Sequence, residues 1–145
     1  MLRMTRSLAV YERVPHQATA TETNFCDAIF GANPSAEAAV GYAGDEPAGM
    51  VVFFHTFSTF LGRTSLYLED IFVEEKWRGC GLGQELMRYV ARLAVTRGCA
   101  RLEWSVLNWN DPAIGFYRQL GATPMDEWTV YRLSGNELAR LAAQV

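Results

Sequence analysis

One stretch of the chain, residues 66–83, constrains the fold more than any other. It begins with an apolar segment that contains two acids, Leu66 to Val73, and it ends in the glycine loop Arg78-Gly79-Cys80-Gly81-Leu82-Gly83. A helical pattern starts directly after the last glycine. A strand, a glycine-rich loop and a helix in this order direct backbone N–H groups and a helix N-terminus toward an anion. The stretch therefore predicts a binding site for a phosphorylated cofactor.

The loop departs from two widespread phosphate-binding motifs. A dinucleotide-binding fold has G-x-G-x-x-G directly after its first strand, and a P-loop ends in Gly-Lys-Ser/Thr. Here Glu74 to Trp77 separate the strand from Arg78, and the glycines are spaced G-x-G-x-G. Taken alone, the loop could also be a glycine-rich turn that starts a helix and binds nothing.

Composition excludes several classes of protein. A chain of 145 residues suits one domain, residues 1–145, and the net charge of −3 argues against nucleic acid or an anionic membrane as a partner. The apolar stretch 49–57 is too short to cross a membrane. The 3 cysteines lack a Cys-x-x-Cys pair and only 2 histidines accompany them, so neither a disulfide framework nor a metal site is expected. We expect a cytoplasmic protein.

Hydrophobic periodicity predicts an α+β fold. Strands are expected at residues 37–43, 48–57, 64–73, 100–107 and 128–133. Helices are expected at residues 2–12, from the capping pattern Thr19-x-x-Glu22 to Gly31, from the glycine loop to Gly98, from Asn110-Asp111-Pro112 to Gly121, and after Ser134. Short connections make the first three strands an antiparallel meander, and the helical crossover makes the fourth parallel to the third. The result is a mixed, mostly antiparallel sheet with helices on its faces.

Further motifs accompany the loop. Arg78-x-x-Gly81-x-Gly83 after an apolar strand resembles the pyrophosphate loop of the Gcn5-related N-acetyltransferase (GNAT) superfamily, and Asn110 with Phe116-Tyr117 falls where that superfamily has its second motif. Four motifs resemble those of the diamine, polyamine and thialysine acetyltransferase branch of this superfamily: Leu66-Tyr67-Leu68-Glu69-Asp70, Trp77-Arg78-Gly79-x-Gly81-x-Gly83, Trp109-Asn110-x-Pro112 and Phe116-Tyr117-x-x-x-Gly121-Ala122. Together they span most of residues 10–135.

This resemblance implies acetyl-CoA as co-substrate. Its pantetheine arm would lie in a wedge between a central pair of parallel, splayed strands, residues 66–73 and 100–107. The residues implied in binding it are Ile71, Phe72, Val73, Arg78, Gly79, Cys80, Gly81, Leu82, Gly83 and Asn110. Glycine permits close approach of a phosphate to the backbone. Arg78 would help by its charge or by shaping the loop, and Asn110 is equally well explained as a helix N-cap.

The resemblance also implies a direct transfer of the acetyl group to an amine. Glu69 would accept the proton of an ammonium whose pKa is roughly 10, and Tyr117 would protonate the departing thiolate. Spacing alone favours Tyr117 as a core residue, and the match to the family motif reverses that preference. Adjacent residues of a regular strand project to opposite faces, so Glu69 and Asp70 share the cleft only if a β-bulge re-aims one of them.

The acceptor is expected to be a small primary amine. Asp70, Asp126, Glu127 and Trp128 could hold a distal ammonium, by charge or by a cation–π contact. Polyamine members of the branch have an acidic, tryptophan-containing segment where this chain has Phe57-Ser58-Thr59-Phe60, so a diamine or a thialysine-like amino acid is favoured over a polyamine. Alternatives are a non-catalytic acyl-CoA-binding module and an acetyltransferase of antibiotic or protein amino groups, with a nucleotide-dependent oxidoreductase last.

The N-terminus departs from the family pattern. Family members begin with a strand and a longer first helix, whereas this chain enters midway along that helix, so the first strand is expected to be missing. An unpaired sheet edge favours association, and we expect a homodimer, as the resemblance also implies.

Overall fold

The computed structural model describes residues 1–144, and the chain divides into two compact units, Met1–Leu107 and Asn108–Val145. Each unit is described by itself. The expectation of a single domain over residues 1–145 stays a prediction. Within the described residues, the helices are all too short or too polar to cross a membrane.

The first unit is built on a sheet with the strand order β1-β2-β3-β4. Its strands are β1 (Glu37–Ala43), β2 (Glu46–Ser58), β3 (Arg63–Val73) and β4 (Leu102–Trp104). The first three strands pair antiparallel, and β3 pairs with β4 in parallel. The predicted α+β class and the mixed, mostly antiparallel sheet are therefore confirmed. Strand β4 is shorter than the predicted range 100–107, because only three of its residues pair with β3.

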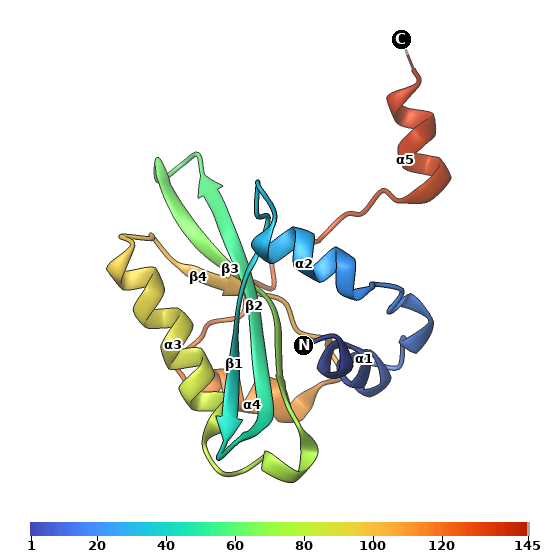
Figure 1. Cartoon of the computed structure of the whole chain (residues 1–145). Coiled ribbons are helices and arrows are strands. Elements are labelled where there is room, and N and C mark those ends of the chain that lie inside the picture. Colours follow the sequence, from blue (N-terminus) through green and yellow to red (C-terminus); the bar gives the residue numbers. More distant parts are fainter. Residues whose placement is uncertain (145) are drawn as a thin grey trace. The chain divides into compact units, whose positions relative to one another are not determined.

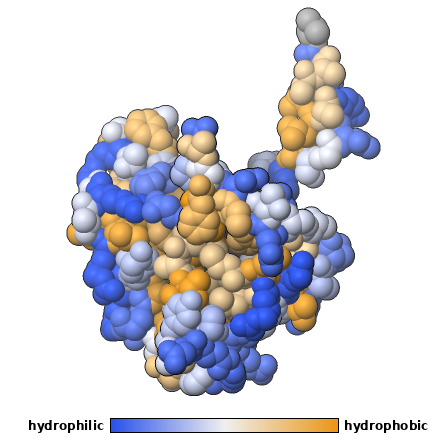
Figure 2. All heavy atoms as spheres, viewed as in Figure 1, coloured by the Kyte–Doolittle hydropathy of each residue, from blue (hydrophilic) through white to orange (hydrophobic). Residues whose placement is uncertain are grey.

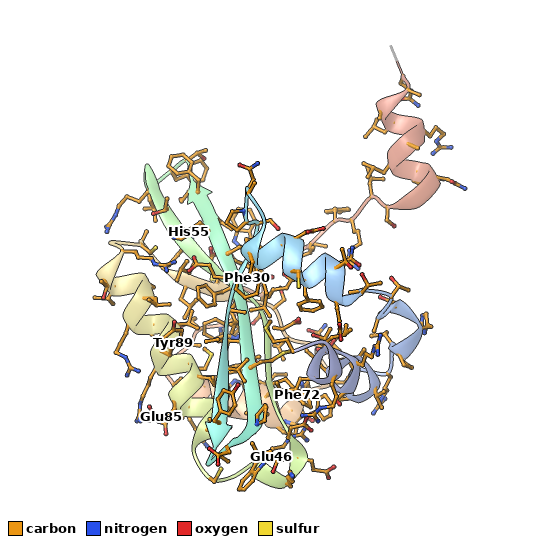
Figure 3. All side chains as sticks on the ribbon, in the orientation of Figure 1. Phe30, Glu46, His55, Phe72, Glu85 and Tyr89 are labelled. Carbon is orange, nitrogen blue, oxygen red and sulfur yellow. The ribbon has the colours of Figure 1, made fainter. Side chains whose placement is uncertain are left out.

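Helices cover both faces of this sheet (Figure 1). Helix α3 (Leu82–Thr96) packs on one face, and α1 (Leu2–Tyr11) and α2 (Glu22–Phe30) lie on the other side. Short 3₁₀ turns occupy Pro15–Gln17 and Glu75–Trp77. The sequence predicted α1 with only a thin apolar face. That face is sufficient to hold the helix on the sheet, because Met4 is 1% exposed and packs with Met50 and Phe72. Figure 3 shows the side chain of Phe72 between the sheet and α1.

Helix α2 begins with a different cap from the predicted one. The prediction placed a capping box at Thr19 and Glu22, whereas the helix starts at Glu22 and Thr21 is its N-cap. The Thr21 hydroxyl accepts from the Asn24 N–H at 3.3 Å, and the Asn24 side chain accepts from the Thr21 N–H at 2.9 Å. Asparagine thus takes the role of the usual Glu or Gln. Gly31 ends the helix as predicted, with extended backbone, and a Cβ there would lie 2.4 Å from the carbonyl oxygen of Asp27.

Strand β1 forms one edge of the sheet. Within residues 1–144 the strands begin at Glu37, so the expected absence of a first strand before the helices is confirmed. Figure 2 shows apolar side chains gathered in the middle of the face on which β1 lies, framed by hydrophilic ones. The homodimer stays a prediction.

The second unit contains α4 (Asp111–Gln119) and α5 (Gly135–Ala142). Both helices were predicted, and Asn110 caps α4 as expected, with its side-chain oxygen 3.3 Å from the N–H of Ala113. The prediction of a strand at residues 128–133 is wrong. Alternating apolar residues favour a strand only where a neighbouring strand completes the ladder, and this segment has no ladder partner within residues 1–144. Ser134 precedes α5 without a side-chain capping bond.

The packing of α3 on the sheet yields a first prediction, at Gly49. A Cβ at this position would lie 2.8 Å from the carbonyl oxygen of Phe72 and 3.1 Å from Leu86 of α3. Backbone cannot yield as a flexible side chain can, so Gly49→Ala should lower the free energy of unfolding by about 1–3 kcal/mol. Urea unfolding measures this loss. As a control, Gly44→Asn changes an open turn position with φ 60° that Asn tolerates, and should cost less than about 1 kcal/mol. Equal stability of Gly49→Ala and the unaltered protein would contradict the close approach of β3 and α3 to this position.

Candidate functional site

A one-sided opening in the sheet forms the centre of the candidate site. Strand β4 pairs with β3 only at Leu66, Tyr67 and Leu68. Strand β3 continues to Val73 and remains paired with β2 to that point. Within residues 1–144, the β4-side edge of β3 from Glu69 to Val73 therefore has no strand partner. The predicted splayed parallel pair is thus present, and Ile71, Phe72 and Val73 lie on the strand segment that an extended ligand could join.

A β-bulge lies at the point where the two strands part. Val52 and Phe53 are consecutive in β2, yet their partners are Asp70 and Leu68, so Glu69 is the extra, unmatched residue. A bulge interrupts the strict alternation of side chains and increases the local twist. The condition under which Glu69 and Asp70 could share one cleft is therefore met.

The register assigns Asp70 to the face that α1 covers. Asp70 pairs with Val52 and Phe72 pairs with Met50, and residues two apart in a strand share a face. Phe72 and Met50 pack against Met4 of α1. Asp70 is consequently a carboxylate between the sheet and the first helix, on the same face as this part of the core.

The electrostatic surroundings of Asp70 are unfavourable to its charge. Burial, and to a smaller extent the neighbouring charges of Glu69 and Glu12, together raise the pKa of Asp70 from 3.8 to about 6. Glu12 is the C-cap of α1, and burial also raises its pKa. Two other carboxyl groups, Glu69 and Glu12, thus act on Asp70. No motif indicated Glu12, which is far from Asp70 along the chain.

The glycine loop has the geometry of an anion-binding helix start. Gly79 and Gly81 have φ values of 78° and 89°, and a Cβ built on either would meet nothing within 4 Å. These positions need glycine for their backbone conformation. Gly81 is the N-cap of α3, and no side chain caps the first turn. The N–H groups of Leu82 and Gly83 are therefore left for a ligand. Cys80 is exposed, and its thiol donates to the carbonyl of Trp77.

Arg78 is held by the protein itself. Its Nε donates to the carbonyl oxygen of Val73 at 2.9 Å, and its guanidinium lies 5.1 Å from the ring centre of Tyr11 and 5.6 Å from that of Phe72. Of the two roles expected for Arg78, charge or loop shape, these contacts favour shape. They join the end of β3 to the end of α1.

Two hydroxyl groups bridge the strands beside the bulge. Tyr67 of β3 and Ser105, which follows β4, lie 2.7 Å apart between their side-chain oxygens. Tyr67 pairs with Phe54, which is two residues from Val52, so this bridge is on the same face as Asp70. Sequence motifs did not reveal the pair, because its members are 38 residues apart.

The remaining predicted residues belong to the second unit. Asn110 caps α4, and Tyr117 lies on α4 with its ring centre 5.4 Å from that of Phe116. Asp126 and Glu127 form a turn, in which the N–H of Trp128 donates to the carbonyl oxygen of Met125 at 3.1 Å. Their roles toward cofactor, proton and substrate stay predictions.

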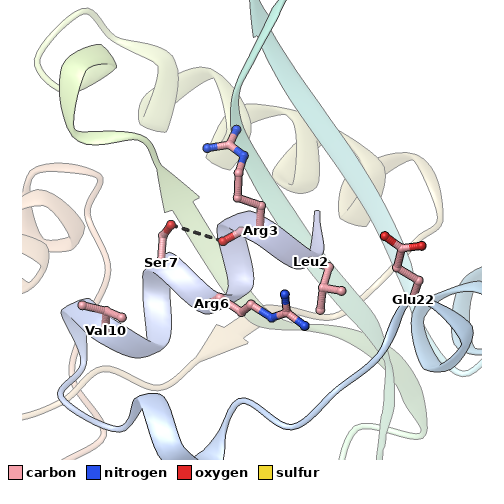
Figure 4. Close-up of a pocket in the computed structure, with 6 residues that line it drawn as sticks. All are labelled: Leu2, Arg3, Arg6, Ser7, Val10 and Glu22. Atoms are coloured by element: carbon pink, nitrogen blue, oxygen red, sulfur yellow. Dashed lines mark hydrogen bonds between the residues drawn. The ribbon is translucent and has the colours of Figure 1, made fainter.

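A shallow pocket of ≈ 370 Å³ lies elsewhere on the first unit (Figure 4). Its lining residues are Leu2, Arg3, Arg6, Ser7, Val10 and Glu22. The α1 residues among them lie on a different side of the helix from Met4 and Leu8, which pack on the sheet. The pocket therefore contains none of the predicted site residues. No cluster of ligating side chains suited to a metal ion occurs among the described residues.

Comparison with known proteins bears on what such a site does. The chain is 34% identical to a thialysine N-epsilon-acetyltransferase of Sus scrofa, over 99% of this chain and 91% of that protein. It is 45% identical to an L-ornithine N5-acetyltransferase of Arabidopsis thaliana, over 63% of this chain and 40% of that protein. A human spermidine/spermine N(1)-acetyltransferase-like protein is 26% identical over 98% of this chain and 22% of that protein.

Solved structures agree with the fold. An integron cassette protein from the mobile metagenome of V. cholerae superposes with a TM-score of 0.82 at 27% identity, covering 99% of this chain and 90% of that one. An aminoglycoside acetyltransferase from an uncultured soil sample superposes with a TM-score of 0.78 at 12% identity, covering 93% and 88%. The second likeness concerns the fold alone.

The family model described as "Acetyltransferase (GNAT) family" matches residues 2–122, which include the wedge, the bulge and the glycine loop. The chain therefore belongs to the GNAT family and is an acyltransferase.

Proposed function

We propose that this protein transfers the acetyl group of acetyl-CoA directly to a primary amine of a small diamine or a thialysine-like amino acid. The observation that carries the proposal is the bulge of β3, which brings acidic groups to the edge of the strand wedge. The relatives named for thialysine and ornithine support an acceptor of this kind.

The residues of the first unit fit the co-substrate. The unpartnered edge of β3 from Ile71 to Val73 would pair with the pantetheine arm, and the loop from Arg78 to Gly83 would hold the pyrophosphate through its N–H groups. Bound there, acetyl-CoA supplies an acetyl group activated as a thioester. The open space beside Gly79 and Gly81 supports this assignment, because side chains there would occupy the path of the phosphates.

The acids of the bulge would bind and deprotonate the acceptor. An ammonium has no lone pair until it loses a proton, and a carboxylate with a pKa near 6 is a better proton acceptor than one near 4. Glu69 or Asp70 takes this proton. The amine nitrogen then forms a bond to the carbonyl carbon while the carbon–sulfur bond breaks, the nitrogen releases its second proton, and Tyr117 donates a proton to the departing sulfur. The overall reaction releases one proton.

The tip of the β2–β3 hairpin bears on the length of the acceptor. Phe57 and Phe60 are 64% and 95% exposed there, and Ser58-Thr59 lie between them, so the tip offers no carboxylate for an additional ammonium. This favours an acceptor with one distal charge over a polyamine.

A panel of amines tests the function. Acetyl-CoA is incubated with short diamines, thialysine, ornithine, lysine, spermidine and spermine, and acetylated products are measured by mass spectrometry. We expect turnover of at least one diamine or amino acid, with kcat/KM for spermine lower by about tenfold or more, the worth of one missing charge contact. Binding of acetyl-CoA without acetylation of any amine would instead favour a non-catalytic acyl-CoA-binding module.

The raised pKa of Asp70 predicts a pH dependence. The ionised form is needed to hold an ammonium, and that form grows as the pH rises through about 6, so kcat/KM for the amine should rise below pH 6 and level off above it. Asp70→Asn should remove this rise of kcat/KM with pH and lower kcat/KM by about 10²-fold or more. Glu69→Gln is the comparison variant, because it keeps Asp70 and removes one neighbouring charge: a rise of kcat/KM moved to lower pH assigns the proton acceptor to Asp70, and a rate lowered at every pH assigns it to Glu69. If kcat/KM of Asp70→Asn still rose with pH in the same range, Asp70 would be excluded as the group that causes the rise.

The proton donor is tested by Tyr117→Phe. Removal of the hydroxyl leaves the ring and its contact with Phe116, so the fold should be kept. We expect kcat to fall by at least about tenfold with the affinity for acetyl-CoA within twofold of the unaltered protein. Steady-state kinetics and calorimetric binding of CoA separate these two quantities. A rate equal to that of the unaltered protein would remove Tyr117 from the reaction.

A further inference from the structure

The hydroxyl bridge between Tyr67 and Ser105 crosses the two parallel strands diagonally. In the ladder, Tyr67 is paired with Glu103, so Ser105 lies two residues beyond the direct partner of Tyr67. Ser105 is also the first residue after β4, whose pairing with β3 ends at Trp104. The 2.7 Å contact between the two side-chain oxygens therefore reaches past the last backbone pair. It joins the strands at the point where they part.

This point is the apex of the wedge, the narrow end remote from the glycine loop. The pairing of β3 with β4 ends at Leu68, β3 itself continues to Val73, and the glycine loop follows. An acyl-CoA whose pyrophosphate lies at the loop, and whose pantetheine arm follows Ile71 to Val73, would therefore direct its acyl group toward the apex. The depth at which the strands come together limits how far that group can enter.

The bridge is well placed to hold the apex closed. The parallel ladder between β3 and β4 has only three residue pairs, and parallel pairing is slightly less stable per residue than antiparallel pairing. A side-chain bond at the end of so short a ladder should therefore matter for keeping it closed. Tyr67 is itself supported by the sheet, because its ring centre lies 5.3 Å from that of Phe54 in β2. The bridge thus anchors the exit of β4 to a residue that β2 supports.

We propose that the Tyr67–Ser105 bridge sets the depth of the wedge and thereby restricts the acyl group of the co-substrate to a short chain. With the bridge intact, β4 stays against β3 as far as Trp104, and the space for the acyl group ends there. Without the bridge, the end of β4 can move away from β3, and the wedge gains room for additional methylene groups. Both residues are positioning residues, because they act through the strands. This inference rests on the proposed function and extends it from the acceptor to the acyl donor.

Two variants remove the bridge with little other change. Tyr67→Phe removes one hydroxyl and keeps the ring beside Phe54. Ser105→Ala removes the other. Tyr67 is half-buried and Ser105 is exposed, so neither change opens a cavity in the core. Circular dichroism checks the fold of both variants and of the double variant.

Calorimetric binding of acetyl-CoA and butyryl-CoA tests the inference without an acceptor amine. We expect the unaltered protein to bind acetyl-CoA more tightly. Either single variant should shift the ratio of the two Kd values toward butyryl-CoA by about 3- to 10-fold, the effect of one hydrogen bond. The double variant should shift it no further, because both changes break the same bond. An unchanged ratio in both single variants, or additive shifts, would overturn the inference.

Thr64→Val is the matched control. Thr64 also lies on β3, and its hydroxyl is 3.9 Å from the thiol of Cys99, which precedes β4. This contact joins the same two segments at the end remote from the wedge. Its removal should leave the Kd ratio within about twofold of that of the unaltered protein, because distant sites act independently. A shift equal to that of Ser105→Ala would indicate a general loosening of the strand pair and would overturn the role of the apex.

Amide hydrogen exchange in the free protein separates the inference from the proposed function. Exchange of the ladder amides in residues 66–68 and 102–104 is followed by NMR. We expect Tyr67→Phe and Ser105→Ala each to accelerate it by about 3- to 10-fold, because local opening of the ladder becomes easier by one hydrogen bond. Unchanged exchange would overturn the inference whether or not an amine is acetylated. If the exchange and the Kd ratio change as expected but the amine panel gives no product, the acceptor class alone is rejected.

Discussion

The bulge at Glu69 is the constraint on which the rest of the site depends. The pairing of β3 with β4 ends at Leu68, and the extra residue follows immediately. A bulge increases local twist, so β3 turns away from β4 at this point while its ladder with β2 resumes at Asp70. One inserted residue thus frees the strand edge for an extended ligand and interrupts the alternation that would have separated Glu69 from Asp70.

The raised pKa of Asp70 lowers the free energy of unfolding at neutral pH. The pKa of Asp70 is raised on folding, so the folded chain binds more protons than the unfolded chain between pH 3.8 and about 6. The free energy of unfolding therefore falls as the pH rises through that interval, and at neutral pH the fold holds a carboxylate that its surroundings disfavour. Perturbed acids of this kind gather at functional sites, because a proton acceptor or an ammonium site needs them. The apolar contacts of Met4, Met50 and Phe72 on the same face help to offset the cost.

Sequence reasoning succeeded where the signal is local. The periods of 2 and 3.6 located β1, β2, β3 and α3, and the glycine spacing located the loop, because each depends on residues close together in the chain. It failed where a distant partner decides the outcome. Residues 128–133 alternate as a strand would, yet no strand pairs with them within residues 1–144, and β4 is cut to three residues by the departure of β3. The Thr21 cap was missed because Asn24, in place of Glu or Gln, completes it. The Tyr67–Ser105 and Tyr11–Arg78 contacts were missed because only the fold brings these residues together.

Helix α1 shows why these distant partners belong to the chemistry. Its apolar side is narrow, and a helix of this length gains little from propensity alone, so its position has to come from tertiary contacts. Those contacts are made to β3 and to the residues that follow it, through Met4, the Arg3–Glu74 ion pair and the stacking of Tyr11 on Arg78. The residues that hold α1 therefore belong to the strand and loop assigned to acetyl-CoA, while the C-cap of α1 adds a carboxylate to the region assigned to the amine. The position of α1 and the base of the glycine loop thus depend on each other through these contacts.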